Sequence, residues 1–167
     1  IFMANLKVTI REELTLNGYD QGAKNTLTIS DVDEVFKRIV TCPANNETTV
    51  ARFRSSVGNA SGTATFDSAL DVQDVKYVRL TNLDSSNSLN LSLQIEVGED
   101  DTGADTSATV LVEAGKSFML GSPHDGVGTV ASGSYNANLV TDLVDLDSLV
   151  VQPGSNSVDV EVYVASA

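Results

Sequence analysis

The chain is poor in the side chains that build metal centres and cross-links. Its 167 residues include one cysteine, Cys42, and one histidine, His124. A lone cysteine cannot form an intramolecular disulfide, and one Cys with one His cannot complete a tetrahedral zinc shell without carboxylates. The sequence therefore predicts neither a disulfide framework nor structural zinc.

Long apolar runs are missing as well. No segment approaches the roughly 20 apolar residues that cross a membrane as a helix. The first residues, Ile1 to Leu6, lack the basic segment and the long apolar stretch of a secretory signal. We therefore expect a protein that is made in a cytoplasm and stays there until it is assembled or released.

Cations are scarce, because ten Lys or Arg stand against 23 Asp or Glu and give a net charge of −13. A field of this sign repels phosphate backbones and anionic membrane surfaces. We expect no nucleic-acid partner and no membrane partner. Acidic surfaces also simply keep proteins soluble in salty water, and this explanation stays open.

Tryptophan is absent, and only nine residues are Phe or Tyr. The 23 acids could supply the carboxylate pair of a glycosidase. Sugar sites usually present aromatic platforms, however, so both a glycosidase and a lectin are disfavoured. The packing must come mainly from β-branched aliphatic side chains, which favour strands.

Apolar and polar residues alternate with period two in three long segments, Leu6–Leu16, Leu89–Val97 and Val158–Val164. This pattern is typical of antiparallel strands with one face in a core and the other toward water. Turn residues such as Asn17-Gly18 and Pro153-Gly154 separate the strands. Shorter candidate strands are Thr26–Ile29, Val35–Thr41, Thr48–Phe53, Thr63–Phe66, Val75–Thr81, Ala108–Glu113, Lys116–Leu120 and Leu149–Gln152.

Short strands with a turn every ten or so residues predict an all-β fold. We expect residues 1–167 to form a single antiparallel β-sandwich domain, jelly-roll-like and with little helix. Residues 1–4 are expected to be a flexible or partner-bound N-terminal arm. A short helix is the alternative for Val32–Val40, because its apolar residues have helical spacing and follow a capping-box pattern at Ser30–Asp33. We favour a strand because the segment is short and its neighbours are strand-like; Ala137–Leu146 is similarly ambiguous.

A catalytic set is not evident. His124 lies between Ser122 and Asp125, but triad members usually converge from separate elements, and no Gly-x-Ser-x-Gly elbow supplies a nucleophile. Neither Gly-x-x-x-x-Gly-Lys-Ser/Thr nor Gly-x-Gly-x-x-Gly occurs, so no phosphate cradle is predicted. We predict no catalytic residues and no cofactor.

One acidic segment has ligand chemistry suited to a hard cation such as calcium. Between Gly98 and Asp105 it gathers carboxylates beside glycines, without the spacing of an EF-hand. A solvated acidic loop is the favoured interpretation, and the same holds for Asp142, Asp145 and Asp147. The weak metal candidates are Glu99, Asp100, Asp101 and Asp105.

A longer pattern runs from Val75 to Leu120. It consists of a strand ending in Val78–Asn82, an amphipathic partner strand, an acidic loop, and a strand closed by Glu113–Ser117. This arrangement resembles small virion structural proteins of tailed bacteriophages, particularly those of marine and cyanobacterial phages. The two ends of the chain, Asn5–Ile10 and Val158–Val164, are similar in kind to such proteins.

The resemblance implies a non-enzymatic jelly-roll-like β-sandwich that decorates or cements a capsid. Its partners would be the major capsid protein or other virion subunits, and it would be a homo-oligomer in place. It would be assembled in the bacterial host cytoplasm. In a capsid, its acidic charge would place it on the outer surface, away from the genome. The apolar residues Ile1, Phe2 and Met3 are the interface candidates, because a partner groove would shield them from water.

Two rival functions stay open. A small tail, head-tail or receptor-binding component would use the same architecture and act through loops such as Asp84–Asn90 or Gly121–Gly133. A hydrolase would use His124 or a carboxylate pair, and is the less favoured of the two.

Overall fold

The computed structural model describes residues 4–54, 70–71, 74–95, 106–121, 128–129 and 144–167. Within these ranges the secondary structure is entirely β and contains no helix, and several antiparallel sheets pack together. The predicted all-β sandwich architecture is therefore confirmed. The longer strands are β1 (Ala4–Glu12), β4 (Ala23–Val32), β5 (Glu34–Cys42), β6 (Thr48–Arg54), β8 (Val75–Asn82), β9 (Leu89–Ile95), β10 (Thr106–Val112), β11 (Ser117–Gly121), β13 (Val144–Pro153) and β14 (Val158–Ser166), and the two-residue strands are β2 (Thr15–Leu16), β3 (Tyr19–Asp20), β7 (Leu70–Asp71) and β12 (Gly128–Thr129).

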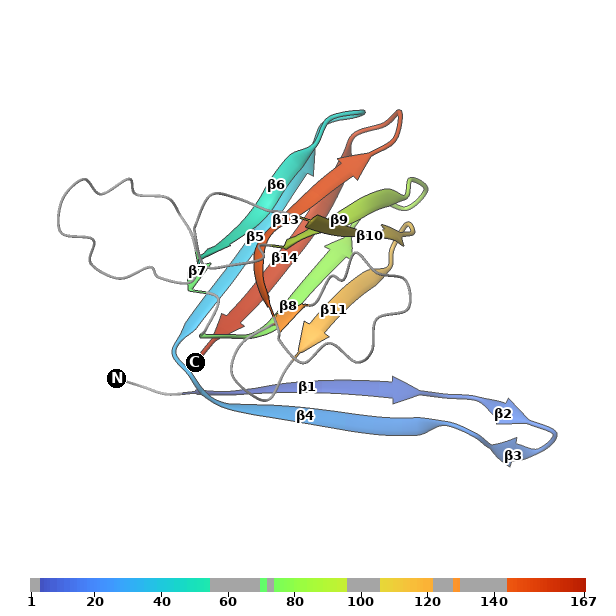
Figure 1. The fold of residues 1–167 in the computed structure, drawn as a ribbon. Coiled ribbons are helices and arrows are strands. Elements are labelled where there is room, and N and C mark those ends of the chain that lie inside the picture. The colour runs from blue at the N-terminus through green and yellow to red at the C-terminus, as the bar shows by residue number, and fades with distance from the viewer. Residues whose placement is uncertain (1–3, 55–69, 72–73, 96–105, 122–127, 130–143) are drawn as a thin grey trace, which may run out of the picture.

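Two sheets form the body of the molecule (Figure 1). The four-stranded sheet has the order β11-β8-β14-β5, and the six-stranded sheet has the order β10-β9-β13-β6-β7, with β12 beside β13. Every pairing is antiparallel except that between β6 and β7. Successive strands thus cross repeatedly between the two sheets.

The eight long strands of the body follow a nested pairing scheme. The first, β5, pairs with the last, β14; the second, β6, pairs with β13. Inside these, β8 pairs with β11 and β9 with β10. The contacts β14–β8 and β13–β9 then join the four pairs into two sheets. The sheet order is therefore fixed by pairings between strands far apart in the sequence.

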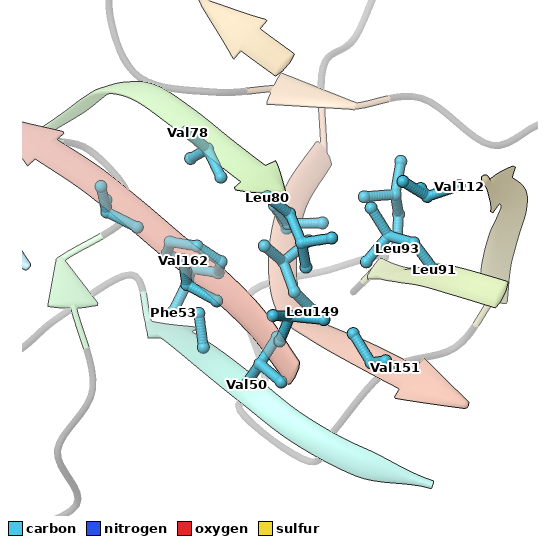
Figure 2. Close-up of a cluster of buried hydrophobic side chains, with 14 of the residues drawn as sticks. Val50, Phe53, Val78, Leu80, Leu91, Leu93, Val112, Leu149, Val151 and Val162 are labelled. Atoms are coloured by element: carbon cyan, nitrogen blue, oxygen red, sulfur yellow. The ribbon is translucent and has the colours of Figure 1, made fainter. Parts of the chain in front are cut away.

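The core fills the space between the two sheets (Figure 2). Leu80 and Val162 come from the four-stranded sheet, and Leu91 and Leu149 from the six-stranded one; all four are fully buried. Alternation along each strand places one apolar side chain in this layer at every second residue. At about 25 cal/mol per Å² of apolar surface, such burial is the main stabilising contribution to the fold.

The ambiguous segment after Val32 is a strand. β5 pairs with β14 residue by residue from Glu34 to Cys42, so the backbone groups on that side of the strand are hydrogen-bonded within the sheet. Long-range pairing overrides the helical spacing of its apolar residues. The predicted strand Thr63–Phe66 lies outside the described residues, as does all of Ala137–Leu146 except its last three residues, which begin β13.

Cys42 ends β5 and is fully buried. Burial raises the pKa of its thiol, and the nearby Asp159 carboxylate acts in the same direction, while a hydrogen bond with Thr48 opposes the shift. Because the thiolate is the reactive form, we expect a thiol-specific disulfide reagent at pH 8 to modify the native protein at least about 1,000-fold more slowly than the urea-unfolded chain. Equal rates in the two states would contradict the burial of Cys42.

Candidate interaction surface

An N-terminal hairpin projects from the body (Figure 1). Its stem is β1 paired with β4, in register from Leu6 opposite Ile29 to Glu12 opposite Ala23, and β2 paired with β3 forms its tip. We call residues 4–9 and 26–32 its root and residues 10–25 its distal half. Since each strand residue adds about 3.3 Å, the distal half extends the hairpin by roughly 25 Å.

The tip has a defined conformation although it is exposed. Asn17 and Gly18 both have positive φ, 53° and 81°, as the type I′ turn of a two-residue hairpin requires. The Gly22 amide donates to Oδ1 of Asp20 at 2.8 Å, and a Cβ at Gly22 would lie 2.4 Å from the carbonyl oxygen of Glu12. Glycine is therefore required at position 22. These local constraints hold the tip in one shape before any partner binds.

The root packs on the outer face of the four-stranded sheet. Ile29 and Val32 are buried there against Tyr77 and Ala165, and flanking apolar side chains extend the contact. The rings of Tyr77 and Tyr163 meet edge to face, with centroids 6.1 Å apart. Burial raises the pKa of the Tyr77 phenol. The root is thus a third layer over one end of the sandwich.

The distal half leaves its apolar side chains in water. Ile10, Leu14, Leu16 and Tyr19 are between 46% and 73% exposed. Leu16 and Tyr19 face each other across the turn and so lie on the same side of the tip. The expectation that one face of the strand Leu6–Leu16 lies in a core is correct at its root and wrong from Ile10 onward. No described element covers the hairpin there, because both of its strands have left the sandwich.

The outer face of the four-stranded sheet has cross-strand rows of side chains. The row nearest the root is Val35, Ala165, Tyr77 and Gly121; the next is Lys37, Tyr163, Arg79 and Met119; the third is Ile39, Glu161, Thr81 and Ser117. The root covers the first row only in part, so Val35 remains exposed, as do Met119 and Ile39 in the rows beyond it.

Charges on this face are concentrated around one carboxylate. Glu161 accepts from Arg79 and forms an ion pair with Lys37 at 3.3 Å. The Arg79 guanidinium also stacks 5.8 Å from the centre of the Tyr163 ring. Two cations therefore share one anion, whereas the chain as a whole is strongly acidic. Farther from the root, Asp159 accepts a hydrogen bond of 2.6 Å from Thr41.

The six-stranded sheet presents a different outer surface, a polar hollow of about 670 Å³. It is lined mostly by amide and hydroxyl side chains, among them Asn90, Gln94 and Thr109, together with the carboxylates of Glu47 and Asp147. Some of these groups already satisfy one another, as where Gln94 donates to the Ser92 hydroxyl at 2.7 Å. This surface can form hydrogen bonds, and within its lining the Ser148 hydroxyl also donates to the Asp147 carboxylate at 2.8 Å.

Most residues singled out from the sequence lie outside the described ranges. This holds for His124 with its neighbours Ser122 and Asp125, for the metal candidates Glu99, Asp100, Asp101 and Asp105, and for Ile1, Phe2 and Met3. Asp147 is described, and it accepts a hydrogen bond of 2.8 Å from Ser148.

The described residues bring together no group of three or more His, Cys, Asp or Glu side chains that could hold a metal ion. None of the elements described is a helix long and apolar enough to cross a membrane.

The exposed hairpin is the candidate surface that sequence reasoning missed. The apolar residues Leu14, Leu16 and Tyr19 flank the Asn17-Gly18 turn, and their closeness to a predicted turn could have indicated exposure. Comparison of the chain with protein-family models, with curated proteins and with solved structures gives no match.

Proposed function

We propose that this chain is a non-enzymatic structural protein of a bacteriophage particle that decorates or cements the capsid. The observation that carries the proposal is the projecting hairpin, whose distal half exposes four large apolar side chains. A two-stranded hairpin is at best marginally stable in water by itself, and exposed apolar surface of this kind is typical of a protein-binding site. The bacteriophage particle is proposed because the segment Val75–Leu120 resembles small virion proteins of tailed phages.

We also propose that the body has the jelly-roll connectivity common among viral coat proteins. In support, the eight long strands of the body pair first with last and second with seventh, and continue inward to the central pair. Rolling up such a nested set of antiparallel pairs gives two four-stranded sheets with this strand order. Particle proteins of this kind act through interfaces and need no active site.

The acidic charge favours a place on the outer surface of the capsid. At a net charge of −13, the protein would be repelled by packaged DNA. The major capsid protein, or another subunit of the particle, is the partner that this placement requires.

A tail or receptor-binding component is the second candidate, favoured by the polar hollow on the six-stranded sheet. The two functions differ in copy number. Quantitative mass spectrometry of purified particles is expected to find this protein in hundreds of copies, scaling with the major capsid protein. A few copies per particle would favour the tail component, and absence from the particles would contradict both.

Retention on the capsid is expected to depend on salt. Lowering the ionic strength from physiological values to 0.01 M lengthens the Debye distance from about 8 Å to about 30 Å, and acidic neighbours then repel one another more strongly. Apolar contacts change little, so particles dialysed to low salt should release more of the protein than particles kept near seawater salt. Adding a chelator should increase the release only if the segment from Glu99 to Asp105 holds a cation. Tighter retention at low salt would contradict this prediction.

A further inference from the structure

We infer that the distal half of the N-terminal hairpin docks on the outer face of the four-stranded sheet of a second copy of this chain. Two apolar surfaces are left open in one molecule. The distal half exposes Leu14, Leu16 and Tyr19, and the outer face exposes Ile39 and Met119. Each surface can cover the other in a second copy, which makes the chain self-complementary.

The root already shows that this hairpin and this sheet fit together. Its apolar side chains pack on Tyr77 and Ala165, and Leu27 comes within van der Waals distance of the position that a Cβ on Gly121 would take. The distal half continues the same two strands beyond the sheet. The rows that begin with Lys37 and Ile39 continue the same sheet face beyond the root. The proposed contact therefore extends an established one across a subunit boundary.

Charge also matches the two surfaces. The distal half carries Glu12, Glu13 and Asp20 besides Arg11 and Lys24, and Arg11 is already paired with Glu13 at 2.6 Å. On the receiving face, Lys37 and Arg79 share the carboxylate of Glu161, and Asp159 lies in the row beyond them, so the face carries no net charge. Acids of the tip can thus approach Lys37 and Arg79 on a neutral face of an otherwise acidic protein.

The distribution of charge along the chain also favours docking of the hairpin on a second copy. The hairpin from Ala4 to Val32 has three Lys or Arg and four Asp or Glu, a net charge of −1, which leaves −12 on the rest of the chain. Two bodies of that charge repel each other, whereas a nearly neutral hairpin can approach a second body at little electrostatic cost. A contact made through the hairpin is therefore repelled less than a contact between two bodies.

The hairpin points away from its own sheet, so a second molecule is the simpler acceptor (Figure 1). When two copies exchange hairpins, each copy contributes its distal half and its receiving face to the interface. Together these are on the order of 25 residues from each copy, which matches the roughly 20–30 residues a side of a standard interface. The resulting oligomer has a finite size if two copies exchange hairpins with each other or if several copies do so around a ring.

Sedimentation of the purified full-length chain over a concentration series tests the inference. The wild type is expected to self-associate. Leu16→Glu on the hairpin and Ile39→Glu on the receiving face should each weaken association about 10- to 100-fold, as expected for losing one buried large apolar side chain. Leu111→Glu is the matched control, because Leu111 is 63% exposed on the other sheet, and it should leave association unchanged. All three sites are exposed, and unchanged melting temperatures at low concentration will check the folding of each variant.

Cross-linking identifies the surfaces in contact. In a Cys42→Ala background, Leu16→Cys and Met119→Cys are combined in one chain and treated with a short bis-maleimide. Cross-links between chains that disappear with Ile39→Glu would support docking between copies. Cross-links only within a chain would overturn the inference in favour of a hairpin that folds back.

A wild-type chain that stays monomeric at all concentrations would overturn the inference too, and would leave another particle protein as the occupant of the hairpin. The capsid role is judged separately, by the presence of the protein in purified particles. Failure of self-association and failure of the proposed function are therefore distinguishable.

Discussion

Replacing Leu149 by alanine is expected to lower the free energy of unfolding by about 3–5 kcal/mol, the range found for Leu→Ala in well-packed cores. Leu149 is fully buried on β13, which lies between β9 and β6, and it pairs with Leu93 on one side and Ala51 on the other. Figure 2 shows its side chain among residues from both sheets. With neighbours held on each side, the sheet cannot collapse into the cavity.

A loss of this size is a large part of the roughly 5–15 kcal/mol that stabilises a typical domain. In thermal unfolding it corresponds to a fall in Tm of about 6–20 °C. Leu111→Ala is the matched control, since Leu111 is an exposed leucine on β10 of the same sheet. Urea unfolding of both variants measures the difference. A cost for Leu149→Ala no greater than that for Leu111→Ala would contradict the two-sheet core.

Asn82→Asp is expected to destabilise the protein by about 3 kcal/mol or more at neutral pH. Asn82 is completely buried at the end of β8. Its Nδ2 group donates to the carbonyl oxygens of Asn87 at 2.8 Å and of Val112 and Glu113 at 3.2 Å, while its Oδ1 accepts from the Asp84 amide at 3.0 Å. One side chain therefore joins the loop after β8 to the turn after β10.

The substitution changes little in shape but removes both donor hydrogens. A carboxylate would then face three carbonyl oxygens, and each buried group left without its partner costs about 1–3 kcal/mol, more for a charge. Protonation relieves the repulsion, so the pKa of the introduced carboxyl should be raised in the folded state. The destabilisation should therefore be smallest below the unfolded pKa of about 4 and grow as the pH rises above it.

Asn156→Asp is the control for the second experiment. Asn156 lies in the exposed turn between β13 and β14, where its amide donates to Asn87 at 3.0 Å. The same chemical change there should cost no more than about 0.5 kcal/mol. Chemical unfolding at pH 4 and pH 7 distinguishes the two sites. An Asn82→Asp variant as stable as the wild type at both pH values would contradict the proposed importance of this network.

The loop that Asn82 anchors is also held by its own carboxylate. Oδ1 of Asp84 accepts from the backbone amides of Ser86 and Asn87, both at 2.7 Å. These hydrogen bonds favour the charged form and lower the pKa of Asp84. The segment Asp84–Asn90, which the sequence analysis names as a possible receptor-binding loop, thus has a defined conformation at its start.

Local chemistry in the sequence determined the strands and several of the turns. Alternation in Val158–Val164 predicted β14 to within two residues, and Thr48–Phe53 predicted β6 to within one. The Asn17-Gly18 turn follows from the low cost of positive φ in these two residue types. Each of these features depends on residues that are neighbours in the chain, which is why it could be read without a structure.

Where the spacing of apolar residues fits both a helix and a strand, only the tertiary structure shows which of the two forms. Val35–Thr41 has apolar residues at helical spacing and also suits a strand, and only its pairing with β14 decides between them. The importance of Asn82 was equally hidden, because its acceptors on Val112 and Glu113 lie about thirty residues away in the chain. An asparagine at a strand end carries no sequence signal for such contacts.

The same alternation occurs in Leu6–Leu16 and in Val158–Val164, yet their surroundings differ completely. β14 lies at the centre of a sheet with its apolar face against a second sheet, whereas none of the described strands forms a layer over the distal half of the hairpin. A period of two specifies which residues share a face but not what covers that face. The sequence by itself determined that the protein is all-β and where many of its strands lie, although β4 and β13 extend well beyond the segments predicted for them. Only the tertiary structure decided which apolar faces are covered, because that depends on the pairing of strands far apart in the chain.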